Sequence, residues 1–295
     1  MKLALGTVQF GLPYGLANRF SPPADAEVMD ILHSAAAAGV DLIDTATLYG
    51  DAEATLGRCM PQGHNFRIVT KTPKFAGLSG IEAVATLNAA FEQSCVRLRD
   101  DGLYGLLTHD AGDLLGENGK VIWQAMLGLR SAGRVARVGS SVYTGAQIDA
   151  LLERYELDLI QLPLSLLDQR LIEGGQLDRL AQRGVEVHAR SAFLQGALLM
   201  DEDELPAHLS ELRPFVAQVA VRARNLGVTR IEAALRYVAN LPQVSAVVCG
   251  VGSARQFDEQ LTALRATAPA LSPDDVAACG CRDPRLLDPS QWKAA

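Results

Sequence analysis

Residues 67–108 have the sequence RIVTKTPKFAGLSGIEAVATLNAAFEQSCVRLRDDGLYGLLT, and this stretch decides the fold. It begins with RIVTK at 67–71, a short run in which β-branched residues favour a strand. An amphipathic stretch at helical spacing follows over 81–98, and a second apolar run occupies 103–108. A strand, a helix and a strand in this order predict a βαβ unit with two parallel strands.

The same alternation continues on both sides of this unit. Six further strands are expected at residues 2–7, 42–44, 135–140, 159–162, 186–191 and 246–249. Further helical patterns cover residues 24–38, 121–132, 145–155 and 215–226. Helix ends are expected at Gly39, Gly133 and Gly184, and capping residues at Asp25, Asp51 and Ser253. Eight strands that each lead into a helix predict an α/β fold, a (β/α)8 TIM barrel; a doubly wound open sheet is the alternative.

The length of 295 residues admits two domains, but α/β barrels commonly exceed about 250 residues as one domain. No linker rich in Pro, Gly or Ser divides the chain. We therefore expect one barrel domain over residues 1–295, with an irregular C-terminal tail from about residue 273. Two long loops, at 11–23 and 193–210, are expected on the face where barrel active sites are built.

The charge and the cysteines limit the class of protein. With 27 Lys and Arg against 34 Asp and Glu, the net charge of −7 argues against a nucleic-acid partner. No apolar run approaches the roughly 18–20 residues of a membrane span, and the first residues lack the apolar region of a signal peptide. The five scattered cysteines suggest reduced thiols and a cytoplasmic location, and Cys279-x-Cys281 lacks metal-site spacing, so no metal is expected.

Polar side chains follow three successive strands of the predicted barrel. Strand 42–44 ends at Asp44 with Tyr49 just beyond, the next strand ends at Lys71, and the third is followed by His109. Taken alone, each has a structural explanation, such as a strand end, a half-buried aromatic or a core histidine. Because the strand ends of a barrel meet at one mouth, the four together predict an active site.

These four residue types suit the reduction of a carbonyl group. A tyrosine is a useful acid only if its pKa, normally about 10, moves toward the working pH, and a neighbouring ammonium lowers it. A buried lysine in turn needs a carboxylate, so we expect Asp44 to pair with Lys71, Lys71 to lower the pKa of Tyr49, and His109 to orient a carbonyl oxygen. The hydride must come from a cofactor, because no side chain supplies one.

Two other classes of function are compatible with the same residues. A lyase or aldolase would use a neutral Lys71 as a Schiff-base amine. A sensor subunit would bind the cofactor without turnover.

The segment GVGSAR at residues 250–255 leaves a strand and enters a helix. Glycines let the backbone approach a phosphate, and a helix N-terminus favours anions. The segment is not the dinucleotide fingerprint of open sheets, because the third glycine is missing.

The ordered set of motifs resembles the aldo-keto reductase family. The matching stretches are IDTATLYG at 43–50, VTKT at 69–72, LTHD at 107–110, LGT at 5–7, GSS at 139–141, SAFLQG at 191–196 and CGVGS at 249–253. The resemblance implies a barrel that reduces aldehydes or ketones reversibly with a nicotinamide cofactor. It also implies Tyr49 as general acid, tuned by Lys71 and Asp44, and His109 as the group that orients the substrate.

The resemblance further implies a set of cofactor contacts. They are Gly6, Thr7, Ser140, Ser141, Gln161, Arg190, Ser191, Phe193, Leu194, Gln195, Gly196, Gly250, Gly252, Ser253, Arg255, Gln256 and Gln260. Phe10 and Tyr14, on the first long loop, are expected to line the substrate pocket.

The sequence departs from the family pattern at several of these positions. Val142 replaces an Asn beside Ser141, and Arg190 stands where the family often has an aromatic residue that stacks on the nicotinamide. Gly252 and Gln256 align with positions that often carry Arg or Lys for a 2′-phosphate. Arg255, one position away, is expected to substitute for them, so NADP(H) is expected over NAD(H).

Overall fold

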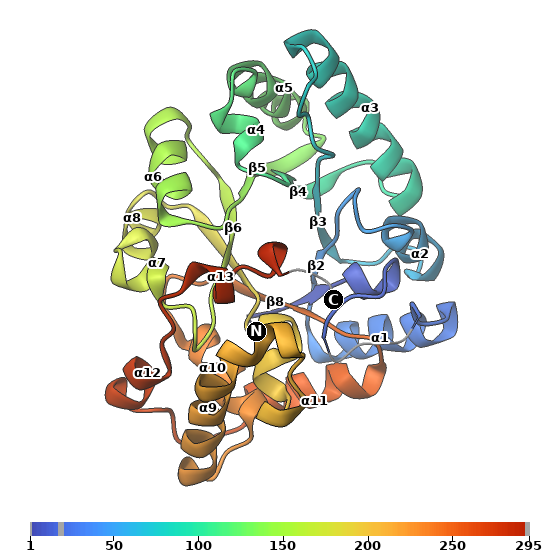
Figure 1. Cartoon of the computed structure of the whole chain (residues 1–295). Coiled ribbons are helices and arrows are strands. Elements are labelled where there is room, and N and C mark those ends of the chain that lie inside the picture. Colours follow the sequence, from blue (N-terminus) through green and yellow to red (C-terminus); the bar gives the residue numbers. More distant parts are fainter. Residues whose placement is uncertain (1, 17–20, 293–295) are drawn as a thin grey trace.

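Eight parallel strands close into a barrel in the order in which they occur along the chain (Figure 1). The structure is a computed structural model that describes residues 2–16 and 21–292. The strands are β1 Leu3–Gly6, β2 Leu42–Asp44, β3 Arg67–Lys71, β4 Leu103–Thr108, β5 Val135–Ser141, β6 Leu159–Pro163, β7 Glu186–Arg190 and β8 Ala246–Gly250. The predicted (β/α)8 barrel is confirmed, and the open sheet is excluded because β1 pairs with both β2 and β8.

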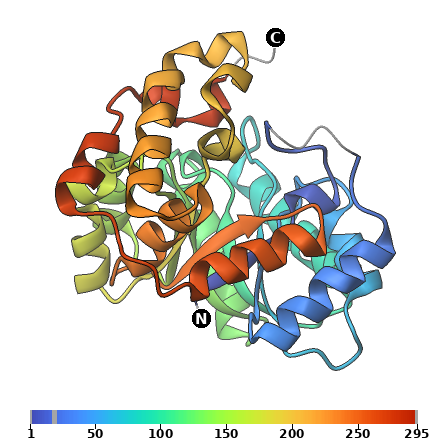
Figure 2. The ribbon, with the colours of Figure 1, turned by 90° about the horizontal axis from the view of Figure 1, so that it is seen from below.

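Closure of the barrel brings the two ends of the sequence together. β1 pairs with β8 over Leu3–Gly6, and the helices that follow these two strands, α1 and α11, pack side by side (Figure 2). Because all strands are parallel, their C-terminal ends lie at one mouth of the barrel, as the active-site prediction requires.

Helices cover the outside of the strands. They are α1 Asp25–Ala38, α2 Ala52–Cys59, α3 Gly80–Leu98, α4 Gly112–Leu115, α5 Gly119–Ser131, α6 Gly145–Arg154, α7 Arg170–Glu173, α8 Gln176–Gln182, α9 Arg213–Leu226, α10 Arg230–Asn240, α11 Ala254–Arg265, α12 Pro273–Cys279 and α13 Pro284–Leu287. The five predicted helices all form, with ends shifted by two residues or fewer. No helix within the described residues is long and apolar enough to cross a membrane.

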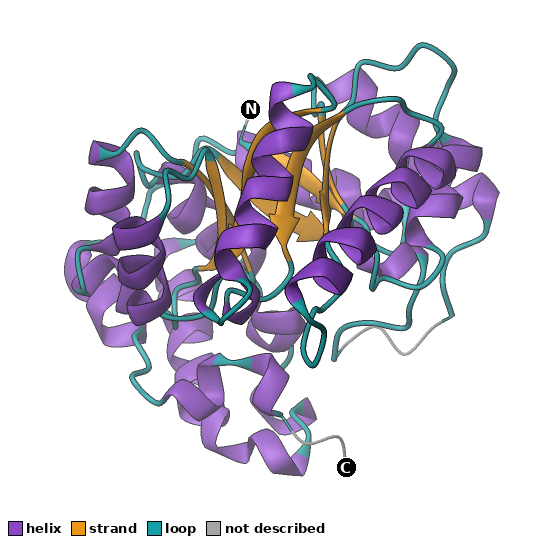
Figure 3. Cartoon of the chain, turned by 90° about the horizontal axis from the view of Figure 1, so that it is seen from above, coloured by secondary structure: helices purple, strands orange, loops and turns teal. Residues whose placement is uncertain are grey.

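The chain beyond residue 273, where we expected an irregular tail, forms the short helices α12 and α13. They pack with the loops after β6 and β7 around a separate apolar cluster that includes Leu167, Leu198 and Cys279. Figure 3 shows helices beyond the end of the barrel at which the strands finish. The first long loop is described only up to residue 16 and again from residue 21.

Helix ends follow the sequence signals in part. Gly39 ends α1 in the left-handed region, with φ of 76° and its N–H bonded to the carbonyls of two preceding residues, as expected of a C-terminal glycine. Ser253 caps α11 by accepting the Gln256 N–H. The expected caps at Asp25 and Asp51 are wrong, because Ala24 holds the capping position of α1 and the Asp51 side chain makes no capping bond.

Candidate active site

A buried ion pair joins the ends of β2 and β3. The Lys71 ammonium donates to both Asp44 carboxylate oxygens, at 2.8 and 2.7 Å, and to the Thr45 carbonyl at 2.9 Å. Both side chains are almost fully buried, at 1% and 5% exposed. Burial lowers the pKa of Lys71, but the charges of Asp44 and Tyr49 and the hydrogen bonds to them together outweigh it and hold the pKa above its ordinary value. Lys71 is therefore an ammonium at neutral pH.

Tyr49 lies in the loop after β2, against this pair. Its hydroxyl is 3.4 Å from Lys71 Nζ, which also lies 4.9 Å from the centre of the phenol ring. The expected lowering of the Tyr49 pKa is not the net result, because burial raises it more than the Lys71 ammonium lowers it. Tyr49 is therefore protonated at neutral pH and has a proton to give.

His109, directly after β4, lies beside Tyr49. Its ring meets the Tyr49 ring edge-on, with centroids 5.6 Å apart and an angle of 84°. Burial, followed by the charges of Lys71, Arg190 and Lys74, lowers the pKa of His109 from 6.5 to about 3. The imidazole is thus neutral, and its buried Nδ1 has no partner in the described structure. The four residues predicted from three strand ends lie together.

Further bonds fix these side chains from behind. Gln161 on β6 donates to Asp44 Oδ1 at 2.7 Å, and the Thr7 hydroxyl donates to the Asp44 carbonyl at 2.9 Å. A second buried carboxylate, Glu53 on α2, accepts from Thr70, the neighbour of Lys71, at 2.6 Å. Arg97 on α3 pairs with the same carboxylate at 2.6 Å. The Glu53 cluster ties α2 and α3 to β3, so it holds the strand that carries Lys71.

A cavity of about 250 Å³ extends from the strand ends between the loop after β7 and the start of α11. Eight of the predicted cofactor residues line it: Ser191, Phe193, Gln195, Gly196, Gly250, Gly252, Gln256 and Gln260. Gln9, Leu199, Ile231 and Glu259 also line it, and the sequence analysis missed them. Gln9 was detectable as a polar residue just after β1, by the strand-end criterion that found the four mouth residues.

The remaining predicted cofactor residues lie outside the lining of this cavity. Gly6 and Thr7 lie at the end of β1, Ser140 and Ser141 at the buried end of β5, and Gln161 is bonded to Asp44. Leu194 is buried in the apolar cluster under the β7 loop, and Ser253 caps α11. Phe10, predicted to line a substrate pocket, packs in the main core at 2% exposed. Tyr14 does line the cavity, with its hydroxyl accepting from Gln195 Nε2 at 3.1 Å.

The polar lining of the cavity fits a dinucleotide. Gln9 Oε1 and Gln260 Oε1 are buried acceptors without partners in the described structure. A Cβ atom at Gly250 would lie 2.3 Å from Gln9 Oε1, so glycine at this position makes room for the end of the Gln9 side chain. Such acceptors suit the hydroxyl and amide donors of a nucleotide.

The start of α11 already holds a carboxylate. Glu27 on α1 accepts the Ala254 N–H at 2.7 Å, and Gln256 accepts the Gly252 N–H at 2.8 Å. Arg255, predicted to meet a 2′-phosphate, is 88% exposed and paired with Glu259 at 3.0 Å. An additional phosphate there would have to draw Arg255 away from Glu259 and tolerate Glu27.

Three neutral groups hold the Arg190 side chain at the end of β7. Its guanidinium donates to the Val142 carbonyl at 3.1 Å and to the Ser191 hydroxyl at 3.3 Å. It also lies over the Tyr143 ring, 4.1 Å from the ring centre. The backbone that follows has left-handed φ angles at Ser191, Leu194 and Gln195, and such strain clusters at functional sites.

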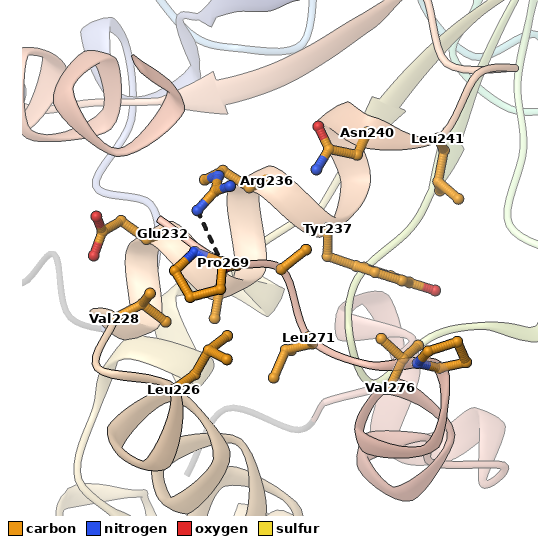
Figure 4. A pocket seen from close by; sticks show the side chains of 13 residues that line it. Leu226, Val228, Glu232, Arg236, Tyr237, Asn240, Leu241, Pro269, Leu271 and Val276 are labelled. Carbon is orange, nitrogen blue, oxygen red and sulfur yellow. Dashed lines mark hydrogen bonds between the residues drawn. The ribbon is translucent and has the colours of Figure 1, made fainter. Parts of the chain in front are cut away.

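A second cavity, of about 260 Å³, lies outside the barrel between α10 and residues 269–276 (Figure 4). Its lining is mainly apolar, with Arg236 bonded to the Pro269 carbonyl and no member of the mouth cluster. No group of three or more metal-ligating side chains occurs in residues 2–16 and 21–292. The mouth of the barrel is thus the candidate active site.

A family model described as the aldo/keto reductase family matches residues 2–280. The chain belongs to the aldo/keto reductase family. A relative called 6-dehydroglucose reductase, from Novosphingobium aromaticivorans, is 27% identical over 280 residues, which cover 89% of this chain and 88% of the relative.

Solved aldo-keto reductases have the same fold. One from Bacillus halodurans, in its holo form, has a TM-score of 0.75 at 20% identity, covering 94% of this chain and 90% of that one. A glycerol dehydrogenase from Gluconobacter oxydans has a TM-score of 0.71 at 20% identity, with the same coverage. This aldo-keto reductase therefore has the same fold as these solved members of its family.

Proposed function

We propose that the protein reduces aldehyde or ketone carbonyls, and oxidises the corresponding alcohols, with a nicotinamide cofactor and Tyr49 as general acid. The observation that carries the proposal is the protonated phenol of Tyr49 held against the buried Lys71–Asp44 pair. When bound, the nicotinamide supplies the hydride, which no side chain can.

The residues of the mouth divide the remaining work. Tyr49 donates a proton to the carbonyl oxygen, and the Lys71 ammonium beside it stabilises the phenolate that is left. Asp44 keeps Lys71 charged, and Gln161 fixes Asp44. Neutral His109 donates one N–H to the same oxygen and so orients the substrate.

The cofactor would be held by the cavity between the β7 loop and α11. The eight predicted residues on its wall, with Gln9 and Tyr14, would bind the dinucleotide. Arg190, Ser141 and Gln161, which lie outside this lining, would contact the nicotinamide. Arg255 favours NADP(H), but Glu259 and Glu27 oppose a 2′-phosphate, so the preference is expected to be small. Tighter binding of NADH than of NADPH would contradict it.

We propose sugars and small polyols, in their carbonyl forms, as the first substrates to test. The names of the relatives, 6-dehydroglucose reductase and glycerol dehydrogenase, support this class. We expect a small-molecule substrate without nucleic-acid or membrane partners, and a cytoplasmic location, in keeping with five free buried cysteines.

The test is a spectrophotometric panel of aldehydes, ketones and sugars with both reduced cofactors. The expected result is carbonyl-dependent loss of the reduced cofactor. Tight cofactor binding without turnover on the whole panel would instead support a sensor subunit.

The Schiff-base alternative is disfavoured by the structure. A Schiff-base lysine must be neutral to attack a carbonyl, whereas the Asp44 carboxylate keeps the pKa of Lys71 high. Borohydride treatment with a carbonyl substrate is therefore expected to leave Lys71 unmodified.

A further inference from the structure

Arg190 brings a positive charge close enough to Tyr49 and His109 to act on both side chains. The carbonyl oxygen has to lie at the Tyr49 hydroxyl and His109 to receive a proton. The cavity that fits the dinucleotide begins at Ser191, the residue after Arg190. The reactive ring of the cofactor would have to reach from this cavity to Tyr49, and the Arg190 charge acts on both Tyr49 and His109.

The Arg190 guanidinium is fixed, and none of the groups that fix it carries a negative charge. Val142, Ser191 and Tyr143 hold it through a carbonyl, a hydroxyl and a ring face. Its charge reaches the reacting groups, because it contributes to the low pKa of His109 after burial and Lys71. A half-buried charge of this kind is screened less by salt than one on the open surface.

The two redox forms of a nicotinamide differ in charge. The ring is neutral when reduced and positive when oxidised, so a fixed cation beside it repels only the oxidised form. We infer that Arg190 discriminates between the redox forms of the cofactor: it weakens the binding of the oxidised form and leaves the binding of the reduced form unchanged. This inference rests on the proposed function, and it gives Arg190 a role that a stacking aromatic residue cannot perform.

The discrimination has a consequence for the catalytic cycle. During carbonyl reduction the spent cofactor is the oxidised form, and repulsion by Arg190 speeds its release. In the opposite direction the same repulsion weakens binding of the oxidised cofactor. Arg190 therefore suits a protein that works mainly as a reductase.

Calorimetric titration of the full chain with the reduced and oxidised forms of each cofactor tests the inference without turnover. Arg190→Gln removes the charge but can still donate to the Val142 carbonyl. We expect the ratio of the oxidised to the reduced dissociation constant to fall by about tenfold, since two unit charges in contact repel by several times RT.

Two controls separate charge from structure. Arg190→Lys keeps a positive charge at this position, and its ratio is expected to stay within about twofold of the wild type. Arg255→Gln, which removes an exposed cation from α11, is expected to change the dissociation constants of both redox forms by the same factor. Thermal melting of each variant reports whether it is folded.

The outcomes separate this inference from the proposed function. Two results overturn the role of the charge while leaving the proposed function standing. One is a ratio of dissociation constants in Arg190→Gln that equals that of the wild type. The other is a ratio in Arg190→Lys that falls as far as in Arg190→Gln. If the wild type binds neither redox form of either cofactor, the proposed function fails and this inference fails with it.

Discussion

The Asp44–Lys71 pair and the cavity between the β7 loop and α11, called the bonded half and the open half of the barrel mouth, differ in how their polar side chains are bonded. At the ends of β2 and β3, Asp44 and Lys71 satisfy each other, with Thr45 and Gln161 completing the set. On the side of β7 and β8, Gln9 and Gln260 keep buried acceptors without partners in the described structure. Near the pair, Thr45 Oγ1, Thr72 Oγ1 and His109 Nδ1 are also buried without partners in the described structure. Since a buried unpaired polar atom costs about 1–3 kcal/mol, the free acceptors of the open half support its proposed role in holding the cofactor, and the ion pair supports the proposed role of the bonded half in the reaction.

This difference predicts which property of the protein a substitution in each half should alter. A substitution in the bonded half removes a charge or proton that the chemistry uses. A substitution in the open half changes which ligand binds and how tightly. The predictions below test this division.

The largest effect is expected from Tyr49→Phe. Losing the general acid should lower kcat by about 10³-fold, while the dissociation constant of the cofactor stays within about twofold. Steady-state kinetics and calorimetry measure the two quantities. Tyr104→Phe is the matched control, because the Tyr104 hydroxyl donates to Glu186 at 2.6 Å and takes no part in the mouth cluster. Full activity in Tyr49→Phe would make the acid assignment wrong.

Lys71→Met should lower both turnover and stability. The phenolate of Tyr49 loses its cation, so we expect kcat to fall about 10²-fold. Asp44 becomes an unpaired buried charge, which should cost about 3–5 kcal/mol in the free energy of unfolding.

Arg97→Met is the control for Lys71→Met, since it removes the cation from another buried carboxylate, Glu53. Denaturant unfolding should show a loss of stability there too, with kcat per folded molecule retained. Equal losses of kcat in both variants would show that burial of a pair, not its place at Tyr49, is what matters.

In the open half, Glu27→Gln should change cofactor choice only slightly. Removing the carboxylate at the start of α11 should tighten NADPH relative to NADH by about threefold, as expected for one charge near a helix terminus. Dissociation constants of the two cofactors measure it. Asp30→Asn, on the exposed side of the same helix, should leave the ratio unchanged. The same ratio in Glu27→Gln and the wild type would place the 2′-position elsewhere.

His109 should contribute no step to the pH profile of kcat/KM between about pH 5 and pH 8. Burial, then the Lys71 charge, lowers its pKa to about 3, so it is neutral throughout that range. Between this value and the ordinary 6.5, the unfolded chain binds the proton that the folded chain excludes. Stability from this group is therefore present above about pH 6.5 and lost as pH falls toward 3.

Melting temperatures across this pH range measure the contribution of His109. His109→Gln should lose less stability on acidification than the wild type, whereas the exposed His33→Gln should behave like the wild type. Equal losses of stability on acidification in His109→Gln and the wild type would contradict an imidazole that stays neutral in the folded protein.

The sequence predicted the barrel and the four mouth residues because their signals are local. The apolar patterns that predict β2 and β3 end at Asp44 and Lys71. Barrel geometry brings the C-terminal ends of consecutive strands together, whatever sequence lies between them. The bounds of β2, β3 and β4 agree with the prediction at both ends.

The rest depended on contacts between distant segments. Glu27 reaches the start of α11 across more than 200 positions of sequence, which no motif reports. Phe10 appeared to be a pocket residue but turned into the core, because a three-residue helical turn, Val8–Phe10, follows β1. The net pKa of Tyr49 depended on burial, which outweighed the charge of Lys71.

The most direct test of the account follows the hydride itself. The wild-type protein is supplied with reduced cofactor carrying deuterium at the transferable position and with the best carbonyl from the panel, and the alcohol is analysed by mass spectrometry. The account predicts one deuterium bonded to the former carbonyl carbon, with the hydroxyl proton coming from solvent through Tyr49. Product without deuterium at that carbon would contradict hydride transfer from the cofactor.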